Sequence, residues 1–587
     1  MPFAANLQSF PWIPTRLALL FLPPSIAYAP AVALAAALSA LFTFLYCRRA
    51  GLSRTAAWAA AGTFACAGYF ASRVMAGHLP LLEAYPALPL LLWLVDRALS
   101  PDRHSRRRFD LGVLASSSAF VAAAGHPQLP AYALASAVLY TLWRSRGRLR
   151  ARVLGALVLG AGLTLAAWWP MLLLVGRSTR VLHLAPSVND VAMPYARLPA
   201  LLIPGIHGWP EPVKLAAAHP FGGFPNASYF WDTADYIGIL PLIAIAALLT
   251  TCIVRRRMLH GRWLFLALLG TGSFLGSLPL ANSLLHLLPG TLFRSPARLL
   301  YLSTFCVAVS FGVALDLFRS AQFRGTPVLL PFVLSLHFLN LWGFTHLFIQ
   351  TAPLATGKTP VFQNILDREV GDGRIAGERD NLDLTYADRY DDAGGFDSIL
   401  LARVYQGLVA TAGIAPGANV QEIDASTFPV KALEATGVRF VITTDTRDDL
   451  PLAASTDDAT LCRVPNPAPR VHFAGGDFHY ERPSSDEILV QTNSTHPGSV
   501  ELLEAFDPGW TATVDGAFAP VTPVHEFSMA VPVPAGAHRV RVSYHTPGRV
   551  MGLLLSALSL VLLIALIASA SQQINHPSVD PNFGAYP

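Results

Sequence analysis

Charged residues are scarce in this chain. Only 13% of its 587 residues are Asp, Glu, Lys or Arg, whereas 53% are hydrophobic, and the mean hydropathy is +0.44. An ordinary soluble domain has about 25% charged residues. The composition therefore excludes a soluble globular enzyme and a disordered chain, and it favours an integral membrane protein.

Cysteine is rare as well, with five residues in the whole chain. Four of them fall in or beside apolar runs, where cysteine packs as a small hydrophobic side chain, and Cys462 stands alone in the more polar part. The sequence contains no CxxC pair, no Cys/His zinc spacing and no Walker A lysine. It therefore indicates no structural zinc, no disulfide scaffold and no nucleotide use, and among cofactors only a divalent cation stays open.

Acidic residues are few in the first part of the chain. Residues 1–350 carry 27 Lys and Arg against 9 Asp and Glu (net +18), and residues 351–587 carry 15 against 28 (net −13), which together give the formal charge of +5. A basic half confined to loops between apolar runs is a signal of membrane topology, not of nucleic-acid binding. We expect a transmembrane core over 1–350, a soluble domain over 351–548, a last helix over 549–570 and a tail over 571–587.

The apolar runs are long enough for a polytopic α-helical membrane protein. A spanning helix needs about 20 apolar residues, and on this basis we expect about eleven transmembrane helices. They lie near 26–47, 55–75, 81–99, 110–124, 130–144, 152–175, 236–254, 262–278, 299–318, 327–349 and 549–570.

Arginine clusters orient these helices. Basic residues follow the first, third, fifth, seventh and ninth helices, and the alternate loops have no such clusters. By the positive-inside rule these five loops are cytoplasmic, as is the tail after 571. The outer side then holds 1–25, 76–80, 125–129, 176–235, 279–298 and 351–548. This arrangement predicts a multi-pass protein of the bacterial plasma (inner) membrane, in contact with the lipid bilayer, with 351–548 extracytoplasmic.

The segment 351–548 has the pattern of a β-rich domain. Residues 438–443 form a short β-branched and aromatic run, and residues 538–544 alternate polar and apolar side chains with period 2. Turn signals such as Asp515-Gly516 separate such runs. We expect a β-sandwich preceded by a smaller α/β portion over 361–445.

Two arginines on the outer side are the first candidates for a binding site. Arg294 and Arg298 flank a Ser-Pro turn before a helix, where the positive-inside rule would not place them. A guanidinium group suits bidentate contact with a phosphate. The alternative is that they reach lipid headgroups or pair with Asp232 or Asp235.

Two histidines lie in similar outer turns, Gly77-His78-Leu79-Pro80 and Gly125-His126-Pro127-Gln128. We consider His78, His126 and Gln128 as contacts for a sugar hydroxyl or phosphate. The alternative is that each histidine caps the carbonyl groups at the end of the preceding helix.

Three carboxylates complete the candidate set. Glu83 lies one turn inside the third helix, and it either has a functional role or pairs with Arg73. Asp232 and Asp235 precede the seventh helix, and they either hold a metal ion or cap the N-terminus of that helix. In the soluble domain, acidic residues surround Gly394-Gly395, but their spacing fits no EF-hand.

Several motifs resemble a known family. They are Pro2-Phe3-Ala4-Ala5-Asn6-Leu7-Gln8-Ser9, Gly125-His126-Pro127-Gln128, Phe293-Arg294-Ser295-Pro296-Ala297-Arg298, Gly509-Trp510-Thr511-Ala512-Thr513-Val514-Asp515-Gly516 and Pro534-Ala535-Gly536-Ala537-His538. In this order they resemble the bacterial YfhO-like membrane proteins, which are grouped with the GT-C glycosyltransferases. The resemblance implies a hexosyltransferase-type enzyme that moves a sugar from a polyprenyl-phosphate carrier to a cell-envelope glycan or glycopolymer on the outer face.

The resemblance also departs from the family pattern at the start of the chain. GT-C proteins place an acidic catalytic residue in the loop after their first helix, and the match here begins at about Pro2. The family's first helix and its acidic loop are therefore expected upstream of Met1, and the chain as given is expected to be inactive. No catalytic residue is assigned, with Glu83 and Asp232 as the fallback. The alternative functions are a lipid or glycan flippase or transporter, and a non-catalytic glycan-binding envelope protein.

Overall fold

The computed structural model divides the chain into two compact units, which are described separately. One unit comprises Asn6–Trp169, Val188–Pro353 and Val550–Pro587, and we call it the helical unit. The other comprises Met1–Ala5, Pro170–Ser187 and Leu354–Arg549, and we call it the β-rich unit. The structure describes residues 5, 21–22, 24–100, 106–182, 192–207, 230–256, 259–280, 295–320, 326–349, 360–377, 389–396, 399–414, 422–444, 447–457, 459–525 and 528–575.

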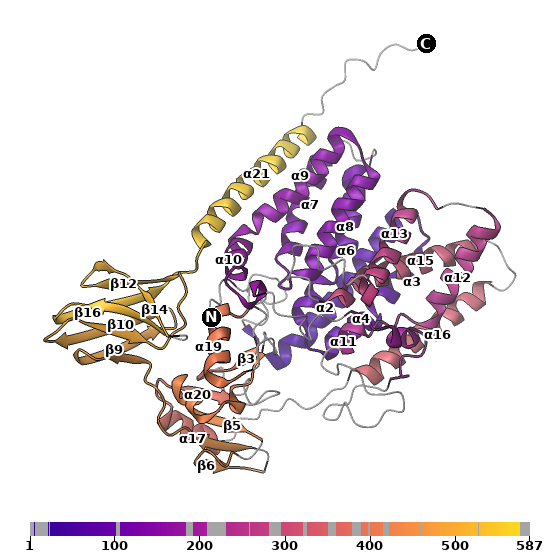
Figure 1. The fold of residues 1–587 in the computed structure, drawn as a ribbon. Helices are drawn as coiled ribbons and strands as arrows, with labels where there is room; N and C mark the ends of the chain where they lie inside the picture. Colours follow the sequence, from indigo (N-terminus) through magenta and orange to yellow (C-terminus); the bar gives the residue numbers. More distant parts are fainter. Residues whose placement is uncertain are drawn as a thin grey trace. The chain divides into compact units, whose positions relative to one another are not determined.

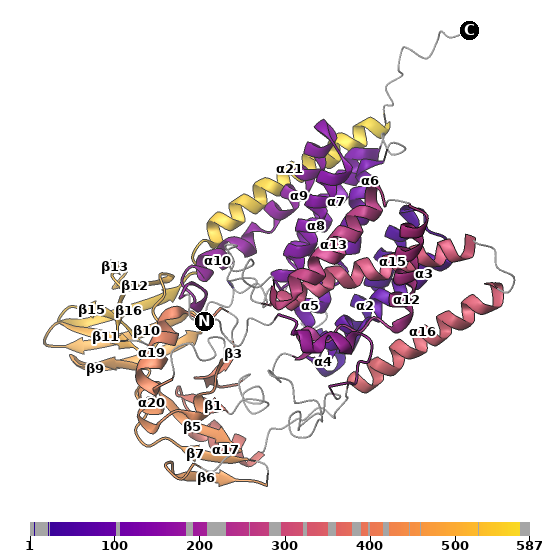
Figure 2. The same ribbon diagram turned by 45° about the vertical axis from the view of Figure 1, so that its right-hand side comes forward.

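Helices make up the helical unit, as Figures 1 and 2 show from two directions. Those in the first part of the chain are α2 (Pro24–Arg49), α3 (Arg54–Ala65), α4 (Gly68–Met75), α5 (Leu79–Ala84), α6 (Ala87–Leu99), α7 (Arg107–Ala122), α8 (Gln128–Arg144), α9 (Gly147–Leu163) and α10 (Leu165–Val175), the last of which crosses the unit boundary. Those that follow are η5 (Tyr195–Leu201), α11 (Phe230–Thr233), α12 (Ile239–Val254), α13 (Gly261–Ser277), η7 (Pro296–Leu299), α15 (Leu300–Ser320), α16 (Thr326–Phe348) and α21 (Arg549–Asn575).

Helical structure is present at every apolar run identified in the sequence, but three of the runs are broken. The run 55–75 divides into α3 and α4, the run 81–99 into α5 and α6, and the run 152–175 into α9 and α10, which are bent by 72°. Pro86 lies at the N-cap position of α6, where its missing N–H costs no hydrogen bond within the helix.

The predicted number of about eleven spanning helices is not confirmed. Among the described residues, four helices are long and apolar enough to cross a membrane, or five if the bent pair counts as one span. The four are Ile26–Arg49, Leu79–Leu99, Pro296–Arg319 and Arg549–Ser569. An apolar, multi-helix protein is what the composition predicted, and the number of spans stays a prediction.

Close contacts at glycines bring several helices together. A Cβ on Gly160 of α9 would lie 2.5 Å from the Ala115 carbonyl oxygen of α7, so the two helices approach at the backbone. The last helix, α21, packs in the same region, where Gly162 meets Ser559 and Gly112 meets Ile567. Small residues permit such close approaches in membrane helices.

The β-rich unit begins with a mixed α/β part. Its five-stranded sheet has the order β2-β1-β5-β7-β6, in which β1 pairs in parallel with both β2 and β5. Its elements are η4 (Thr179–Val181), α17 (Pro360–Glu369), β1 (Arg374–Gly377), β2 (Asp391–Asp392), β3 (Gly395–Phe396), α19 (Ala402–Ala412), β4 (Glu422–Ile423), η8 (Ala425–Thr427), α20 (Val430–Ala435), β5 (Val438–Thr443), β6 (Leu452–Ser455) and β7 (Thr460–Arg463).

Two antiparallel sheets follow and share one apolar core. Their orders are β13-β12-β16-β10-β9 and β14-β15-β11-β8. The strands are β8 (Val471–Phe473), β9 (Gly476–Ser484), β10 (Glu487–Ser494), β11 (Gly498–Leu502), β12 (Trp510–Val514), β13 (Ala517–Ala519), β14 (Thr522–Val524), β15 (Ser528–Val533) and β16 (Gly536–Tyr544). Side chains such as Val490, Val500, Val531 and Val540 are fully buried between the sheets. The β-rich region predicted before the last helix is confirmed, and β5 and β16 contain the two strands read from the sequence.

Candidate functional site

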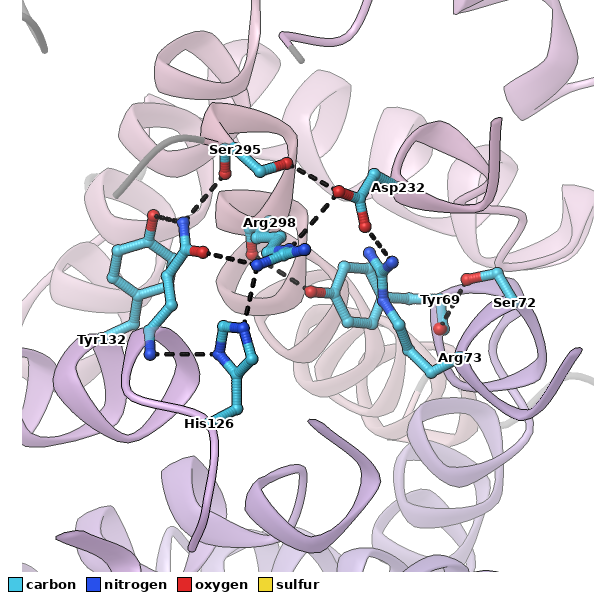
Figure 3. A network of polar contacts seen from close by, with 9 residues as sticks. Tyr69, Ser72, Arg73, His126, Tyr132, Asp232, Ser295 and Arg298 are labelled. Carbon is cyan, nitrogen blue, oxygen red and sulfur yellow. Dashed lines mark hydrogen bonds and ion pairs between the residues drawn. The ribbon is translucent and has the colours of Figure 1, made fainter. Parts of the chain in front are cut away.

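A buried network of polar side chains joins four separate segments of the helical unit (Figure 3). Arg73 comes from α4, Gln128 from the start of α8, Asp232 from α11 and Arg298 from η7. Arg73 and Arg298 are separated by more than two hundred residues in the sequence, and Figure 3 shows both guanidinium groups directed toward the Asp232 carboxylate.

Asp232 is the anion at the centre of the network. One of its carboxylate oxygens forms an ion pair with Arg73, and the other lies 3.4 Å from Nε of Arg298. The hydroxyl of Ser295 donates a hydrogen bond of 2.8 Å to that second oxygen. Asp232 is buried, so it depends on these partners to offset the cost of removing a charge from water.

Arg298 has further partners in the turn before α8. Its Nη1 lies 3.0 Å from Nε2 of His126 and 3.0 Å from the side-chain oxygen of Gln128. The Gln128 amide nitrogen in turn donates to the Ser295 carbonyl oxygen at 3.0 Å and to the Tyr132 hydroxyl at 2.8 Å. A guanidinium group can only donate, so Nε2 of His126 is the acceptor in its contact with Arg298.

Tyr69 contacts both arginines. The Arg73 guanidinium lies over its ring, 4.5 Å from the centroid, and the Tyr69 hydroxyl donates to the Arg298 carbonyl oxygen at 3.4 Å. Behind Tyr69 the stacked rings of Phe64 and Tyr85 continue into the apolar core. The Arg73 guanidinium therefore rests on an aromatic layer, and the same tyrosine holds the backbone of Arg298.

A close backbone approach brings α11 to α4. The Gly68 amide donates to the Tyr236 carbonyl oxygen at 2.6 Å, and a Cβ on Gly68 would lie 2.5 Å from the Tyr236 nitrogen. Only glycine leaves room for this approach. It brings the segment that carries Asp232 next to the helix that carries Arg73.

The network has more donors than acceptors. Among the ion pairs of the described residues, two guanidinium groups share one carboxylate, which leaves these three groups with one positive charge in excess. Within the described parts of the chain, Nε and Nη2 of Arg73 and Nδ1 of His78 are buried without a hydrogen-bond partner. Because an unsatisfied buried donor costs about 1–3 kcal/mol, this arrangement suits an additional anionic group.

The network lies at the helix ends remote from the basic clusters. The helix α8 begins at Gln128 in the network and has 17 residues, ending at Arg144, which at 1.5 Å per residue is roughly 25 Å away. The helix α15 likewise follows Arg298 and has Arg319 in its last turn. At the far end of α8, Arg144 and Arg262 surround Asp96.

The structure brings Arg298, His126, Gln128 and Asp232 of the predicted set into this one network. His78 lies beside it, with its ring 5.9 Å from that of Trp231. Arg294 is outside the described residues, so its role stays a prediction.

The structure also bears on the alternative roles that the sequence left open for Asp232, Asp235 and Glu83. Neither Asp232 nor Asp235 caps the seventh predicted helix, because α12 begins at Ile239 with Gly238 at the cap. Asp235 instead accepts a hydrogen bond of 2.9 Å from Thr304. Glu83 lies half-buried on α5, and Arg73 pairs with Asp232.

Sequence reasoning did not assign roles to Tyr69, Arg73, Tyr132 and Ser295. Arg73 carried the one usable signal, since a charged residue inside an apolar helix is a functional hypothesis by default. Ser295 gave no signal, because Asp232 is distant in the sequence, whereas Tyr132 accepts a hydrogen bond from Gln128 four residues earlier on α8. In the described residues, no group of three or more His, Cys, Asp or Glu side chains is arranged to hold a metal ion.

The architecture defines a class of protein, an apolar multi-helix membrane protein that carries a β-rich region before its last helix. Residues 489–556 match the family model described as bacterial membrane protein YfhO. This match covers β10 to the first turns of α21 and confirms the resemblance to the YfhO-like proteins. A comparison with curated proteins gives no match.

Among solved structures, the chain is similar to the arabinofuranosyltransferase AftD from Mycobacteria. The structure of its R1389S mutant, class 2, is 12% identical to this chain with a TM-score of 0.47. The similarity covers 92% of this chain and 55% of that chain. A second AftD structure is 11% identical with a TM-score of 0.46, and 92% of this chain covers 53% of it. The chain thus spans about half the length of the AftD chains.

Proposed function

We propose that the protein is a membrane-embedded glycosyltransferase of the GT-C type. In this proposal it transfers a sugar from a polyprenyl-phosphate carrier to a cell-envelope glycan acceptor on the outer face of the bacterial plasma membrane. The observation that carries the proposal is the network around Asp232, in which the buried Arg73 and the half-buried Arg298 share a single carboxylate. The match of residues 489–556 to the YfhO model supports it.

The carrier phosphate is the group that this network suits. Arg73 retains two buried nitrogen atoms without an acceptor in the described residues, and Arg298 lies next to it across Asp232. A phosphate oxygen accepts several hydrogen bonds and carries the charge that would neutralise the excess. His78 and His126 lie at the same place and offer ring nitrogens to a phosphate or a sugar hydroxyl.

The chemistry of transfer gives the arginines a second role. In the reaction, the oxygen of an acceptor hydroxyl forms a bond to the anomeric carbon, and the bond from that carbon to the carrier phosphate oxygen breaks. The acceptor proton passes to a base, and the phosphate departs with the electron pair. Negative charge grows on the leaving phosphate, so nearby guanidinium groups stabilise the transition state more than the ground state.

Asp232 is better suited to hold the arginines than to act as the base. Its oxygens accept contacts from Arg73, Arg298 and Ser295, which stabilise the ionised form. Glu83 is the other candidate that the sequence offers. We leave the base unassigned among the described residues and give Asp232 the role of positioning Arg73 and Arg298.

Binding of a polyprenyl phosphate to the purified full chain tests this proposal. Arg298→Ala should weaken binding by about 1.5–3 kcal/mol, the usual contribution of a hydrogen bond to a charged group, which is about 10- to 150-fold. Arg298→Lys should restore binding in part, because lysine keeps the charge but lacks the planar pair of N–H donors of a guanidinium group.

Arg319→Ala is the matched control. Arg319 lies in the last turn of the same helix segment and donates to Ser53, remote from the network. It should leave binding unchanged. Equal affinities for the wild type, Arg298→Ala and the double variant Arg73→Ala/Arg298→Ala would rule out this phosphate site.

A further inference from the structure

A second cluster of charged side chains lies inside the β-rich unit, where its α/β part meets the two-sheet part. Arg374 comes from β1, Asp391 from β2 and Arg482 from β9. Arg470 directly precedes β8, and Glu504 follows β11. Five residues from five places in the chain therefore converge, and none of them belongs to the network in the helical unit.

The contacts in this cluster are dense. Arg470 and Arg482 approach the same oxygen of Asp391 at 2.9 and 3.0 Å. Glu504 pairs with Arg470, lies 3.4 Å from Arg482 and lies 3.6 Å from Arg374. Arg374 is held by the backbone, with hydrogen bonds to the carbonyl oxygens of Thr436 at 2.8 Å and Leu503 at 2.7 Å.

The charges do not balance. Three guanidinium groups face two carboxylates, and the side chain of Arg470 is only 3% exposed. In the described parts of the chain, Nε and Nη1 of Arg470 and Nε of Arg482 are buried without a hydrogen-bond partner. Burial lowers the pKa of Arg374 to about 10 against the attraction of Glu504, with the charges of Arg470 and Arg482 acting in the same direction as burial. A cluster with excess positive charge and unused donors suits one more oxyanion.

Asp391 is the member that a ligand could replace. Its side chain is 53% exposed, whereas that of Glu504 is 19% exposed. It lies on a strand of two residues, and its carboxylate already presents an oxygen to two guanidinium groups. Burial acts to raise the pKa of Asp391, but the hydrogen bond from Arg482 and the charge of Arg470 outweigh it and lower the pKa.

We propose that Arg374, Arg470 and Arg482 form an oxyanion-binding site of the β-rich unit, which takes a phosphate or carboxylate group in the place of the Asp391 carboxylate. The arginine forks match the planar geometry of a carboxylate and two oxygens of a phosphate equally well. The site is independent of the network around Asp232 and of the function proposed for it. A purely structural ion cluster is the competing explanation. It predicts that Asp391→Asn does not bind an added anion more tightly.

The test uses the full chain in detergent and measures binding of inorganic phosphate and of glucuronate at constant ionic strength. Asp391→Asn removes the competing carboxylate, so binding of at least one of the two probes should become at least tenfold tighter than in the wild type. Asp449→Asn is the matched control. Asp449 is 50% exposed and pairs with Arg447, which is bonded to two backbone carbonyl oxygens.

The comparison of the two Asn variants decides the matter. Equal affinities for both probes in Asp391→Asn and Asp449→Asn would overturn the proposal. Tighter binding of phosphate alone, or of glucuronate alone, would support it and identify the class of ligand. The double variant Asp391→Asn/Arg482→Gln should lose most of the gain, and if the gain persists, the anion binds elsewhere and the proposal is wrong.

A single change in a partly exposed residue covers the case in which Asp391→Asn fails to fold. The side chain of Arg482 is 22% exposed, so Arg482→Gln is expected to keep the fold. In the wild-type background it should weaken binding of the preferred probe at least fivefold. Unchanged affinity for both probes in Arg482→Gln would contradict the site.

Discussion

Asp232 connects two arginines that lie far apart in the sequence, and this single carboxylate sets the charge of the network in the helical unit. Each guanidinium group has a further partner, Tyr69 of the same helix for Arg73 and Gln128 of α8 for Arg298. Removal of the carboxylate would leave the buried Arg73 and the half-buried Arg298 without the anion that lies between them. The cost of such an uncompensated charge, about 3–5 kcal/mol, exceeds the net stabilisation that a well-made buried pair provides.

Asp232→Asn should therefore lower the free energy of unfolding by about 3–5 kcal/mol. Added polyprenyl phosphate should recover part of this loss, because a ligand that binds only the folded state stabilises it by mass action. The measurement is the melting temperature of wild type and variant with and without the carrier. If the carrier raises the melting temperature of the variant less than that of the wild type, the phosphate does not bind beside Asp232.

The sequence alone singled out some residues of this site but did not predict their contacts. The sequence marked Arg298 as unusual, since it is a cation on the side where topology does not call for one, and it left pairing with Asp232 open. It could not choose, because ion pairs such as Arg73–Asp232 and Arg298–Asp232 join distant segments. Ser295 donates to Asp232, a partner that only tertiary packing brings near, whereas Tyr132 accepts from Gln128 one helical turn away on α8.

At the scale of elements, hydropathy located the helices but not their breaks. The expected run 55–75 is mostly apolar, yet it ends as α3 at Ala65 and resumes as α4 at Gly68. The amide of Gly68 is bonded to Tyr236, a residue of another segment. A hydropathy window does not detect such a break, because the break is caused by a contact with a distant part of the chain.

Gly68→Ala should disrupt the network without changing any of its side chains. The added Cβ would lie 2.5 and 2.8 Å from the Tyr236 backbone nitrogen and oxygen, so the segment with Asp232 must move away from α4. We expect carrier binding to fall at least tenfold. Gly272→Ala on α13 is the control, because a Cβ there meets no atom within 4 Å. Equal binding by the two variants would show that this approach does not position Asp232.

The contact between α7 and α9 gives a second prediction at this scale. Gly160→Ala would place a Cβ 2.5 Å from both the Ala115 oxygen and the Ser118 Cβ, and such overpacking typically costs about 1–3 kcal/mol. Gly155 lies on the same helix with open space around it, so Gly155→Ala should be neutral or stabilising by up to about 1 kcal/mol. Melting temperatures of both variants in one detergent test this. A stable Gly160→Ala would mean that α9 and α7 are not in backbone contact.

For the whole molecule, the distribution of charge predicts which side of the membrane each part faces. The arginines of the basic loops lie at one end of helices such as α8 and α15, and the Asp232 network lies at the other. By the positive-inside rule we expect the network on the outer side. Residues Leu354–Arg549 of the β-rich unit follow α16 and lead into α21, at the ends without basic clusters, so we expect them to be extracytoplasmic.

Cysteine labelling in spheroplasts tests this orientation. Phe518 is 78% exposed in the β-rich unit, so Phe518→Cys should react with a membrane-impermeant maleimide in a background where Cys66 and Cys252 are replaced by Ser. Arg255→Cys, at the end of α12, should react only after the membrane is permeabilised. The reverse pattern would invert the topology and remove the outer-face site.

The most direct test of the central claim is photochemical labelling of the full chain with a polyprenyl phosphate that carries a photoreactive group next to the phosphate. We expect labelled peptides from α4, the turn before α8, α11 and η7. Labelling should be reduced by unlabelled carrier and by Arg298→Ala. Labelling that falls on other segments, or that persists unchanged in Arg298→Ala, would contradict this claim.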